Sequence, residues 1–191
     1  MADISIIGTG NMGQAIAAVA GRGGHSVQLL GQDDAGTQVA GEVVVLAVPY
    51  GALGEVLAER ADSLHGKIVV DITNPVNFET FDSLLVPADT SATAEIAAAL
   101  PSSRVLKAFS TTFAATLASG KVGDATTTVL IAGDDAEAKS VLASVVSSGG
   151  LKALDAGGLK RARELEALAF LQITLAAAEK ISWAGGFGVI N

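Results

Sequence analysis

Three glycines near the beginning of the chain are spaced as in a turn that holds phosphate groups. Residues 3–7 form an apolar, β-branched run, and residues 8–13 read Gly-Thr-Gly-Asn-Met-Gly before an alanine-rich segment. In such a turn between a strand and a helix, bare backbone amides and the positive end of the helix dipole face a pyrophosphate. We expect Gly8 to allow the tight turn, Gly10 to leave room for the pyrophosphate and Gly13 to let the helix pack closely on the sheet. The predicted cofactor-binding residues of this turn are Gly8, Thr9, Gly10, Asn11, Met12 and Gly13.

Residues 32–34, just after the second expected strand, bear on the choice between NAD and NADP. Asp33 lies 20 residues after Gly13, the spacing at which an acidic residue commonly accepts the ribose 2′-hydroxyl of NAD. The 2′-phosphate of NADP needs a cation there, and residues 32–34 supply none. Gln32 and Asp33 are therefore predicted cofactor-binding residues. The alternative is that these carboxylates only solvate a loop and cap a short helix.

Polar or turn-forming clusters follow three other apolar runs. Strands are expected at 42–48, 67–72 and 104–109. The carboxyl ends of parallel strands lie along one edge of an open sheet, where ligands bind at the point at which strand order reverses. We therefore expect the clusters to meet the glycine turn in one crevice. Their predicted site residues are Ala47, Val48, Pro49 and Tyr50, then Thr73, Asn74 and Pro75, and finally Ser110 and Thr111.

The remaining pattern predicts the elements that must position these residues. Half of the residues are hydrophobic but only 4% are aromatic, a composition typical of a buried parallel sheet covered by helices. We predict an α/β fold, Rossmann-like and doubly wound, with a mostly parallel sheet and a small C-terminal helical part. Residues 1–150 would form the dinucleotide-binding domain, and residues 151–191 a strand-helix part that completes the fold and contributes to a dimer. Further strands are expected at 25–30, 126–131 and 151–154, and helices at 91–100, 134–147 and 159–181.

Charge and composition exclude several classes of function. The formal net charge of −8 argues against binding a nucleic-acid backbone or an anionic membrane. The chain has no cysteine and only two isolated histidines, so we expect no thiolate chemistry and no metal site. It enters its first strand without a basic region or a cleavage signal, which predicts a cytoplasmic location. Its longest apolar helical segment, around 165–178, is too short to span a bilayer.

A set of spaced motifs extends over nearly the whole chain. They are Gly8-Thr9-Gly10-Asn11-Met12-Gly13, Ala47-Val48-Pro49-Tyr50, Val69-Val70-Asp71-Ile72-Thr73-Asn74-Pro75, Lys107-Ala108-Phe109, Gly133-Asp134-Asp135, and Leu154-Asp155-Ala156-Gly157 before Ala162-Arg163-Glu164-Leu165-Glu166. Together they resemble the NADP oxidoreductases that depend on coenzyme F420, a deazaflavin. The resemblance implies a Rossmann-type domain, a homodimer and direct hydride exchange between a nicotinamide and the deazaflavin. Because members without F420 often carry the same description, a flavin (FMN or FAD) is the second choice of hydride partner.

The chain departs from the pattern of that family at three places. Where the family has Ser-Arg to bind the 2′-phosphate, this chain has Gln32-Asp33, so NAD becomes an alternative to NADP. The family's frequent asparagine after Lys-Ala-Phe is Ser110, and Gly158 replaces a frequent proline. Contacts on the side of the second ring are therefore expected to differ as well.

The clusters also suggest where two rings would lie. We place the nicotinamide along the strand edge near Val48, Pro49 and Asn74, with the second ring facing it. Hydride transfer between stacked rings needs close approach but no protein nucleophile, so we assign no catalytic residue. The residues predicted on the side of the second ring are Ser110, Thr111, Trp183 and Phe187. For the two aromatic residues, packing in the core or in a dimer is the alternative.

Two other functions fit part of the sequence. An imine reductase of the pyrroline-carboxylate reductase type opens with a segment similar to residues 10–13, but it requires a large helical dimerisation domain. Only about forty residues follow Gly150. A non-catalytic sensor would bind NAD or NADP in the same pocket and no second ring.

Overall fold

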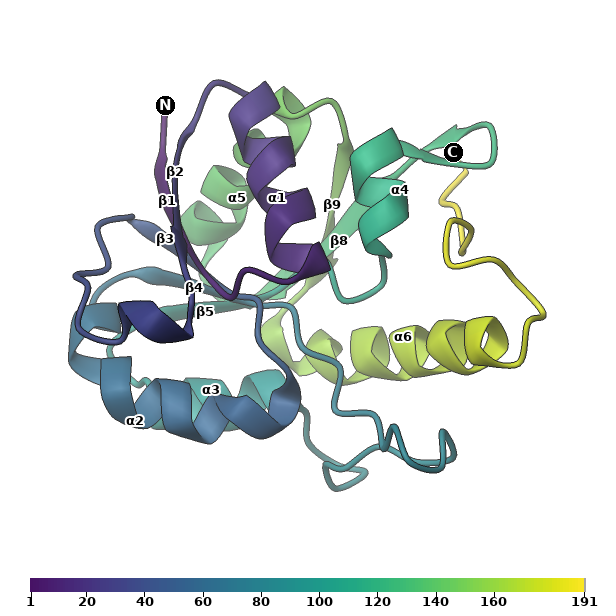
Figure 1. Ribbon diagram of the computed structural model, residues 1–191, viewed down its shortest axis with the longest axis horizontal. Helices are drawn as coiled ribbons and strands as arrows, with labels where there is room; N and C mark the ends of the chain where they lie inside the picture. Colours follow the sequence, from purple (N-terminus) through teal and green to yellow (C-terminus); the bar gives the residue numbers. More distant parts are fainter. Residues whose placement is uncertain (191) are drawn as a thin grey trace.

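A seven-stranded sheet with helices on both faces forms the centre of the molecule in the computed structural model, which describes residues 1–190 (Figure 1). The strands of this sheet are β1 (Asp3–Ile7), β2 (Ser26–Leu30), β3 (Val43–Leu46), β4 (Ile68–Asp71), β5 (Arg104–Lys107), β8 (Thr128–Gly133) and β9 (Lys152–Gly157). A separate hairpin pairs β6 (Lys121–Val122) with β7 (Ala125–Thr126). The helices are α1 (Asn11–Arg22), α2 (Leu53–Leu64), α3 (Ala92–Ala99), α4 (Ala114–Ser119), α5 (Ala136–Ser148) and α6 (Ala162–Ala177), with short 3₁₀ turns η1 (Gln32–Asp34), η2 (Tyr50–Ala52) and η3 (Leu159–Arg161).

The strand order is β2-β1-β3-β4-β5-β8-β9, and this order confirms the predicted doubly wound, mostly parallel sheet. The first five strands in space are parallel, β8 runs antiparallel to β5, and β9 is parallel to β8. The chain passes from β1 to β2 on one side and then crosses to β3 on the other. The point at which strand order reverses therefore lies between β1 and β3, where α/β folds bind their ligands.

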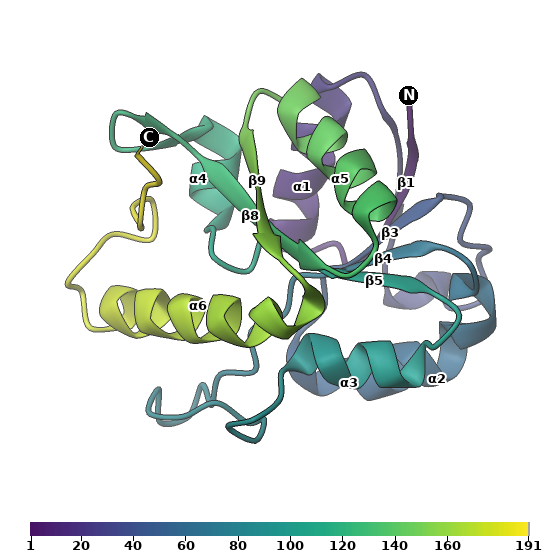
Figure 2. The ribbon, with the colours of Figure 1, turned by 180° about the vertical axis from the view of Figure 1, so that it is seen from behind.

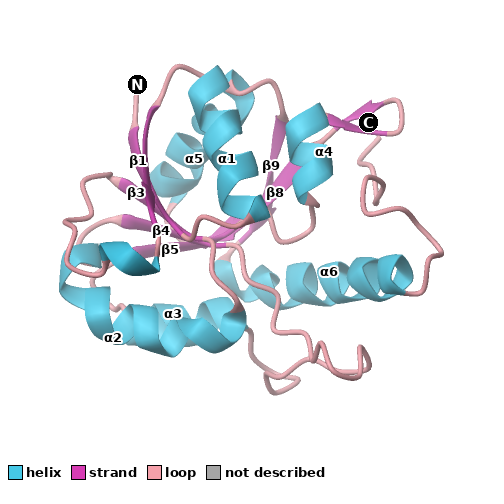
Figure 3. Cartoon of the chain, viewed as in Figure 1, coloured by secondary structure: helices cyan, strands magenta, loops and turns pink. Residues whose placement is uncertain are grey.

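Each face of the sheet has its own apolar core, because side chains alternate along the strands. Ile6 and Val45 point to the face covered by α1, α4 and α5, whereas Val44 and Val69 point to the face covered by α2 and α3. Figure 2 shows the same two layers from behind, with α6 on the side of α2 and α3. The secondary-structure view in Figure 3 shows a long loop between the end of β4 and the beginning of α3.

Several predicted boundaries differ from the structure, and one helix and one hairpin were missed. The strand expected at 126–131 is β8 at Thr128–Gly133. The predicted helix over 159–181 begins as the 3₁₀ turn η3 and ends as α6 at Ala177, before a chain reversal in which Glu179 has a φ of 56°. The strand expected at 151–154 extends to Gly157. Helix α4 and the β6–β7 hairpin were not predicted, because elements of six and two residues are too short to show a hydrophobic period. No helix within residues 1–190 has the length and apolar character needed to cross a membrane.

Candidate functional site

A cavity of about 550 Å³ lies at the point where strand order reverses. We call it the switch-point cavity. Its wall is formed by the residues that follow β1, β2 and β3 and by residues 55–60 of α2. The residues that line it are Ile7, Gly8, Thr9, Gly10, Leu30, Gly31, Gln32, Ala35, Ala47, Val48, Pro49, Ala52, Glu55, Val56, Glu59 and Arg60. The structure thus brings together seven of the predicted cofactor residues: Gly8, Thr9, Gly10, Gln32, Ala47, Val48 and Pro49.

The three glycines within residues 8–13 are glycines for different structural reasons. Gly8 has a φ of 119°, and a Cβ atom there would lie 2.1 Å from the Ala47 carbonyl oxygen. A Cβ on Gly13 would lie 2.1 Å from the Gly8 carbonyl oxygen, so the beginning of α1 packs directly against the turn at this residue. A Cβ on Gly10 would meet no atom within 4 Å. No protein atom thus prevents a side chain at position 10, and the residue is nevertheless glycine. A glycine at such an open position is expected where a ligand approaches the backbone closely.

Gly10 is also the N-cap residue of α1. The amides of Asn11, Met12 and Gly13 come before the first helical hydrogen bond, from the Gln14 amide to the Gly10 carbonyl. The first turn of α1 carries no acidic residue. Its amides and the helix dipole therefore favour an anion at the wall of the cavity.

The end of the cavity near η1 differs from the sequence prediction. Asp33 is exposed and lies outside the cavity wall, so its contact with a ribose hydroxyl stays a prediction. The Asp34 carboxylate accepts a hydrogen bond of 2.8 Å from the Gly31 amide and so caps η1. Arg60, from the second half of α2, lines this end and was not predicted. Nothing in the local sequence separates Arg60 from an ordinary solvated helix residue, and only the packing of α2 beneath η1 identifies it.

A second, smaller cavity of about 370 Å³ adjoins Pro49 and Tyr50 on the other side. It is lined by Pro49, Tyr50, Gly51, Val76, Asn77, Phe78, Glu79 and Leu85. The Tyr50 hydroxyl donates a hydrogen bond of 2.8 Å to the Glu95 carboxylate. Burial, together with the hydrogen bond to Glu95 and the nearby negative charge, raises the pKa of Tyr50 to about 12. Tyr50 is therefore a neutral hydroxyl at physiological pH.

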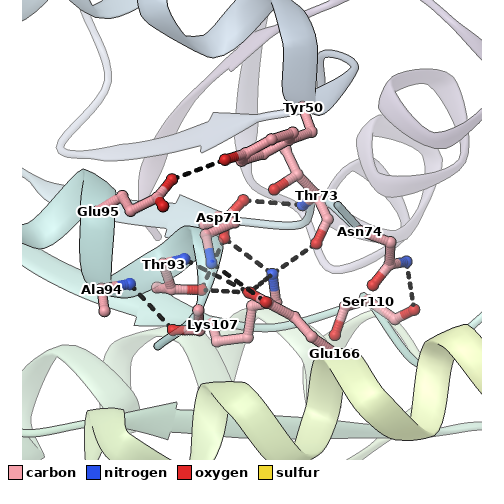
Figure 4. Close-up of polar contacts among 12 residues, drawn as sticks. Tyr50, Asp71, Thr73, Asn74, Thr93, Ala94, Glu95, Lys107, Ser110 and Glu166 are labelled. Atoms are coloured by element: carbon pink, nitrogen blue, oxygen red, sulfur yellow. Dashed lines mark hydrogen bonds and ion pairs between the residues drawn. The ribbon is translucent and has the colours of Figure 1, made fainter. Parts of the chain in front are cut away.

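Beneath the strand ends lies a buried triad formed by Asp71, Lys107 and Glu166 (Figure 4). Register places Asp71 of β4 directly beside Lys107 of β5, and α6 brings Glu166 over both. The Lys107 ammonium donates to Asp71 Oδ2 at 2.8 Å, to Glu166 Oε1 at 2.9 Å and to the Thr73 carbonyl at 2.5 Å. These acceptors use all three of its protons. All three charged side chains are at most 1% exposed.

The triad contains one cation and two carboxylates, and backbone donors offset part of the excess negative charge. Glu166 Oε2 accepts a hydrogen bond of 3.1 Å from the Ala92 amide at the beginning of α3. Burial raises the pKa of Glu166, and the opposing effect of the Lys107 ammonium is smaller. The sequence had shown Lys107 and Glu166 only as parts of separate motifs, 59 residues apart. Glu166 was not predicted as part of any site because its partners belong to other elements.

The triad fixes the loop that carries Thr73, Asn74 and Pro75. Asp71 Oδ1 accepts the Thr73 amide at 2.8 Å, while Lys107 holds the Thr73 carbonyl. Asn74 Nδ2 then donates to the Ser110 carbonyl at 2.9 Å. Within residues 1–190, three buried side-chain oxygens have no hydrogen-bond partner: Thr73 Oγ1, Asn74 Oδ1 and Ser110 Oγ. Figure 4 shows Asn74 and Ser110 next to each other, so these predicted residues form one polar group that has capacity left for a ligand.

The backbone at this place is strained. Phe109, which is buried, has a φ of 60°, a left-handed conformation that a bulky residue rarely adopts. Its carbonyl accepts from both the amide and the hydroxyl of Thr112. The strain occurs directly before Ser110, where β5 leads into the loop with the unpartnered oxygens.

The predicted residues of the C-terminal segment lie farther from the switch-point cavity. Gln172 of α6 donates to the Thr111 carbonyl at 3.4 Å and accepts from the Phe187 amide at 3.1 Å. Trp183 packs against Phe113, with ring centroids 5.0 Å apart. Trp183 and Phe187 thus flank the loop after β5, and neither lines the switch-point cavity or the smaller cavity beside Tyr50.

Comparison with known proteins agrees with this geometry. A family model described as NADP oxidoreductase, coenzyme F420-dependent, matches residues 32–75, which include β3, β4 and their site loops. The F420-dependent NADP reductase of Methanocaldococcus jannaschii is 30% identical over 156 residues, which cover 80% of this chain and 70% of that protein. The chain belongs to this family.

Two further proteins are similar to this member of the F420-dependent NADP oxidoreductase family. A structure from Arthrobacter sp. FB24, solved as a candidate F420-dependent NADP reductase, superposes over the whole of both chains with a TM-score of 0.87 at 24% identity. At that identity the match supports the fold. The metalloreductase STEAP3 of Rattus norvegicus is 37% identical over 112 residues, which are 59% of this chain but 22% of that protein.

Proposed function

We propose that this protein is an oxidoreductase that transfers a hydride between a nicotinamide dinucleotide and the deazaflavin coenzyme F420, with FMN or FAD as the second choice of partner. The observation that carries the proposal is the switch-point cavity, whose wall contains the bare Gly10 backbone and continues along Val48 and Pro49 to the second cavity beside Tyr50. Such a surface suits two ligands, one that carries a pyrophosphate and one that has a flat ring.

Each part of the site would have a separate task. The amides at the beginning of α1 would bind the pyrophosphate, and Val48, Pro49 and Asn74 would border the nicotinamide. When bound, the reduced nicotinamide supplies a hydride to the second ring and becomes a cation. The unpartnered oxygens of Asn74 and Ser110 would orient polar groups of the rings, since buried polar atoms seek partners.

No side chain is required as a nucleophile. The hydride would pass directly between the two rings, and the proton that completes reduction of the second ring at its nitrogen would come from solvent. The contribution of the protein would be close stacking of two rings and exclusion of water. Trp183 and Phe187, which are half-exposed beside the loop after β5, would cover the second ring or contact a partner subunit in the proposed homodimer. The residues 151–191 would then form the small part that completes both the ring site and the dimer.

The test is a mixing assay with purified protein. NADPH or NADH is added with F420, FMN or FAD, and the absorbance of the oxidised ring is followed while nucleotide binding is measured in parallel by calorimetry. We expect loss of the F420 absorbance at a rate that depends on protein concentration. Binding of the nucleotide with no change in any ring absorbance would contradict the enzyme and leave the non-catalytic sensor.

A further inference from the structure

One cation lines the switch-point cavity, and it is a buried arginine. Arg60 is 5% exposed and lies on α2, where it faces the end of the cavity formed by Gly31, Gln32 and Ala35. Its guanidinium donates to the Thr37 carbonyl at 3.0 Å and to the Asp34 carbonyl at 2.5 Å. These two bonds fix the position of the guanidinium beneath the loop that follows β2.

Arg60 has no counter-ion in the part of the chain that the structure describes. The ion pairs within residues 1–190 involve other arginines and lysines, and the two partners of Arg60 are neutral carbonyls. A buried charge without an opposite charge is costly, and a guanidinium has five N–H donors, of which two carbonyls occupy two. Arg60 therefore has both charge and hydrogen-bonding capacity left for an anion in the cavity.

The position of Arg60 indicates which anion this is. In a doubly wound sheet with the fingerprint after β1, the end of β2 borders the adenosine ribose. Gly10 at the beginning of α1 lines the same cavity, and Arg60 lies next to the loop after β2, where it donates to the Asp34 carbonyl. A pyrophosphate bound at α1 would therefore direct the adenosine ribose toward Arg60. Glu55 and Glu59 also line this end, but both are exposed and are screened by solvent.

We propose that Arg60 binds the 2′-phosphate of NADP and makes this site selective for NADP over NAD. The inference rests on the proposed function, because it presumes a dinucleotide in the switch-point cavity. Helix α2 then supplies the cation that the sequence lacks at residues 32–34. A guanidinium held by two carbonyls presents a fixed, charge-assisted donor pair to a phosphate.

The test compares binding of NADPH and NADH to the full-length protein and to Arg60→Gln by calorimetry. We expect Arg60→Gln to weaken NADPH binding about 10- to 100-fold and to change NADH binding by less than about twofold. Arg60→Lys keeps the charge but loses the planar fork, so it should recover part of the NADPH affinity.

Arg22 offers a matched control. It also donates to two carbonyls, those of Gly149 and Leu117, but it is exposed and lies outside the cavity. Arg22→Gln should leave the ratio of NADPH to NADH affinity unchanged. If Arg60→Gln weakens both nucleotides equally, or neither, Arg60 is only a clamp for the loop and the proposal is wrong.

A measurement on the unchanged protein covers the case in which Arg60→Gln does not fold. Adenosine 2′,5′-bisphosphate should bind at least about tenfold more tightly than adenosine 5′-monophosphate, because only the former carries the 2′-phosphate. Equal affinities would overturn the role of Arg60. If neither NADPH nor NADH binds to the unchanged protein, the proposed function itself fails, which is a different result.

Discussion

The turn between β1 and α1 and the buried triad of Asp71, Lys107 and Glu166 lie at the same edge of the sheet but are built in opposite ways. The turn offers backbone amides, and its one open position, Gly10, is surrounded by space. The triad consists of fully buried side chains that satisfy one another. The proposed phosphate site thus depends on the absence of a side chain at Gly10. The triad, in contrast, depends on the identity of its three side chains.

The largest effect is expected from removing the cation of the triad. Lys107→Met leaves two buried carboxylates without their partner and should lower the free energy of unfolding by about 3–5 kcal/mol. Urea unfolding measures this loss. The control is Lys139→Met, because Lys139 binds Asp155 at the same distance of 2.8 Å but the Asp155 side chain is 61% exposed. That variant should lose less than about 1 kcal/mol, and equal losses would contradict the view that burial gives the triad its importance.

A methyl group added at two glycines of the turn should separate ligand binding from folding. Gly10→Ala should raise the Kd for NADPH about tenfold or more by intruding on the pyrophosphate, while the free energy of unfolding changes by less than about 1 kcal/mol. Gly13→Ala should lower the stability instead, because its Cβ would lie 2.1 Å from the Gly8 carbonyl oxygen. Calorimetric binding and thermal unfolding of both variants test this. A Gly10→Ala protein that binds NADPH normally would show that the phosphate lies elsewhere.

The smallest effect concerns the pH dependence of stability. The pKa of Glu166 is raised in the folded protein from its ordinary 4.5, so at pH values between the unfolded and the folded pKa the folded state binds more protons than the unfolded state. The contribution of Glu166 to stability is therefore complete below about pH 4.5 and declines as the pH rises through the folded pKa. Thermal unfolding should be measured at several pH values for the natural protein and for Glu166→Gln. The Tm of the natural protein minus that of Glu166→Gln should be larger in acid than at neutral pH. Glu164→Gln, at an exposed position on the same helix, is the control, and a pH-independent difference for Glu166→Gln would refute the raised pKa.

The sequence predicts the turn well because its signal is local. The spacing of three glycines after a strand is sufficient to identify the roles of Gly8 and Gly13, and the strand periods predict which loops reach the same edge. The two strands that carry Asp71 and Lys107 were predicted, but their pairing was not, because the register that places these residues side by side is defined only by the folded sheet.

Other features depend on packing that no local pattern encodes. Arg60 reaches the cavity because α2 lies beneath η1, and Glu166 reaches the triad because α6 crosses the ends of α3 and β5. The left-handed conformation of Phe109 is imposed by its surroundings, since phenylalanine itself disfavours it. Asp33, by contrast, has the right spacing in the sequence but points to solvent in the structure.

The single tryptophan of the chain is Trp183, and it packs on Phe113 close to the loop after β5. Trp183 is therefore an intrinsic fluorescent reporter, because light of a wavelength that mainly indole absorbs excites this residue alone. A flat, coloured molecule that arrives near that loop would quench the emission, while an oxidised dinucleotide held only beside Gly10 would leave it almost unchanged, because oxidised nicotinamide does not absorb the light that indole emits. The occupancy of the two halves of the site can thus be followed separately without any added label.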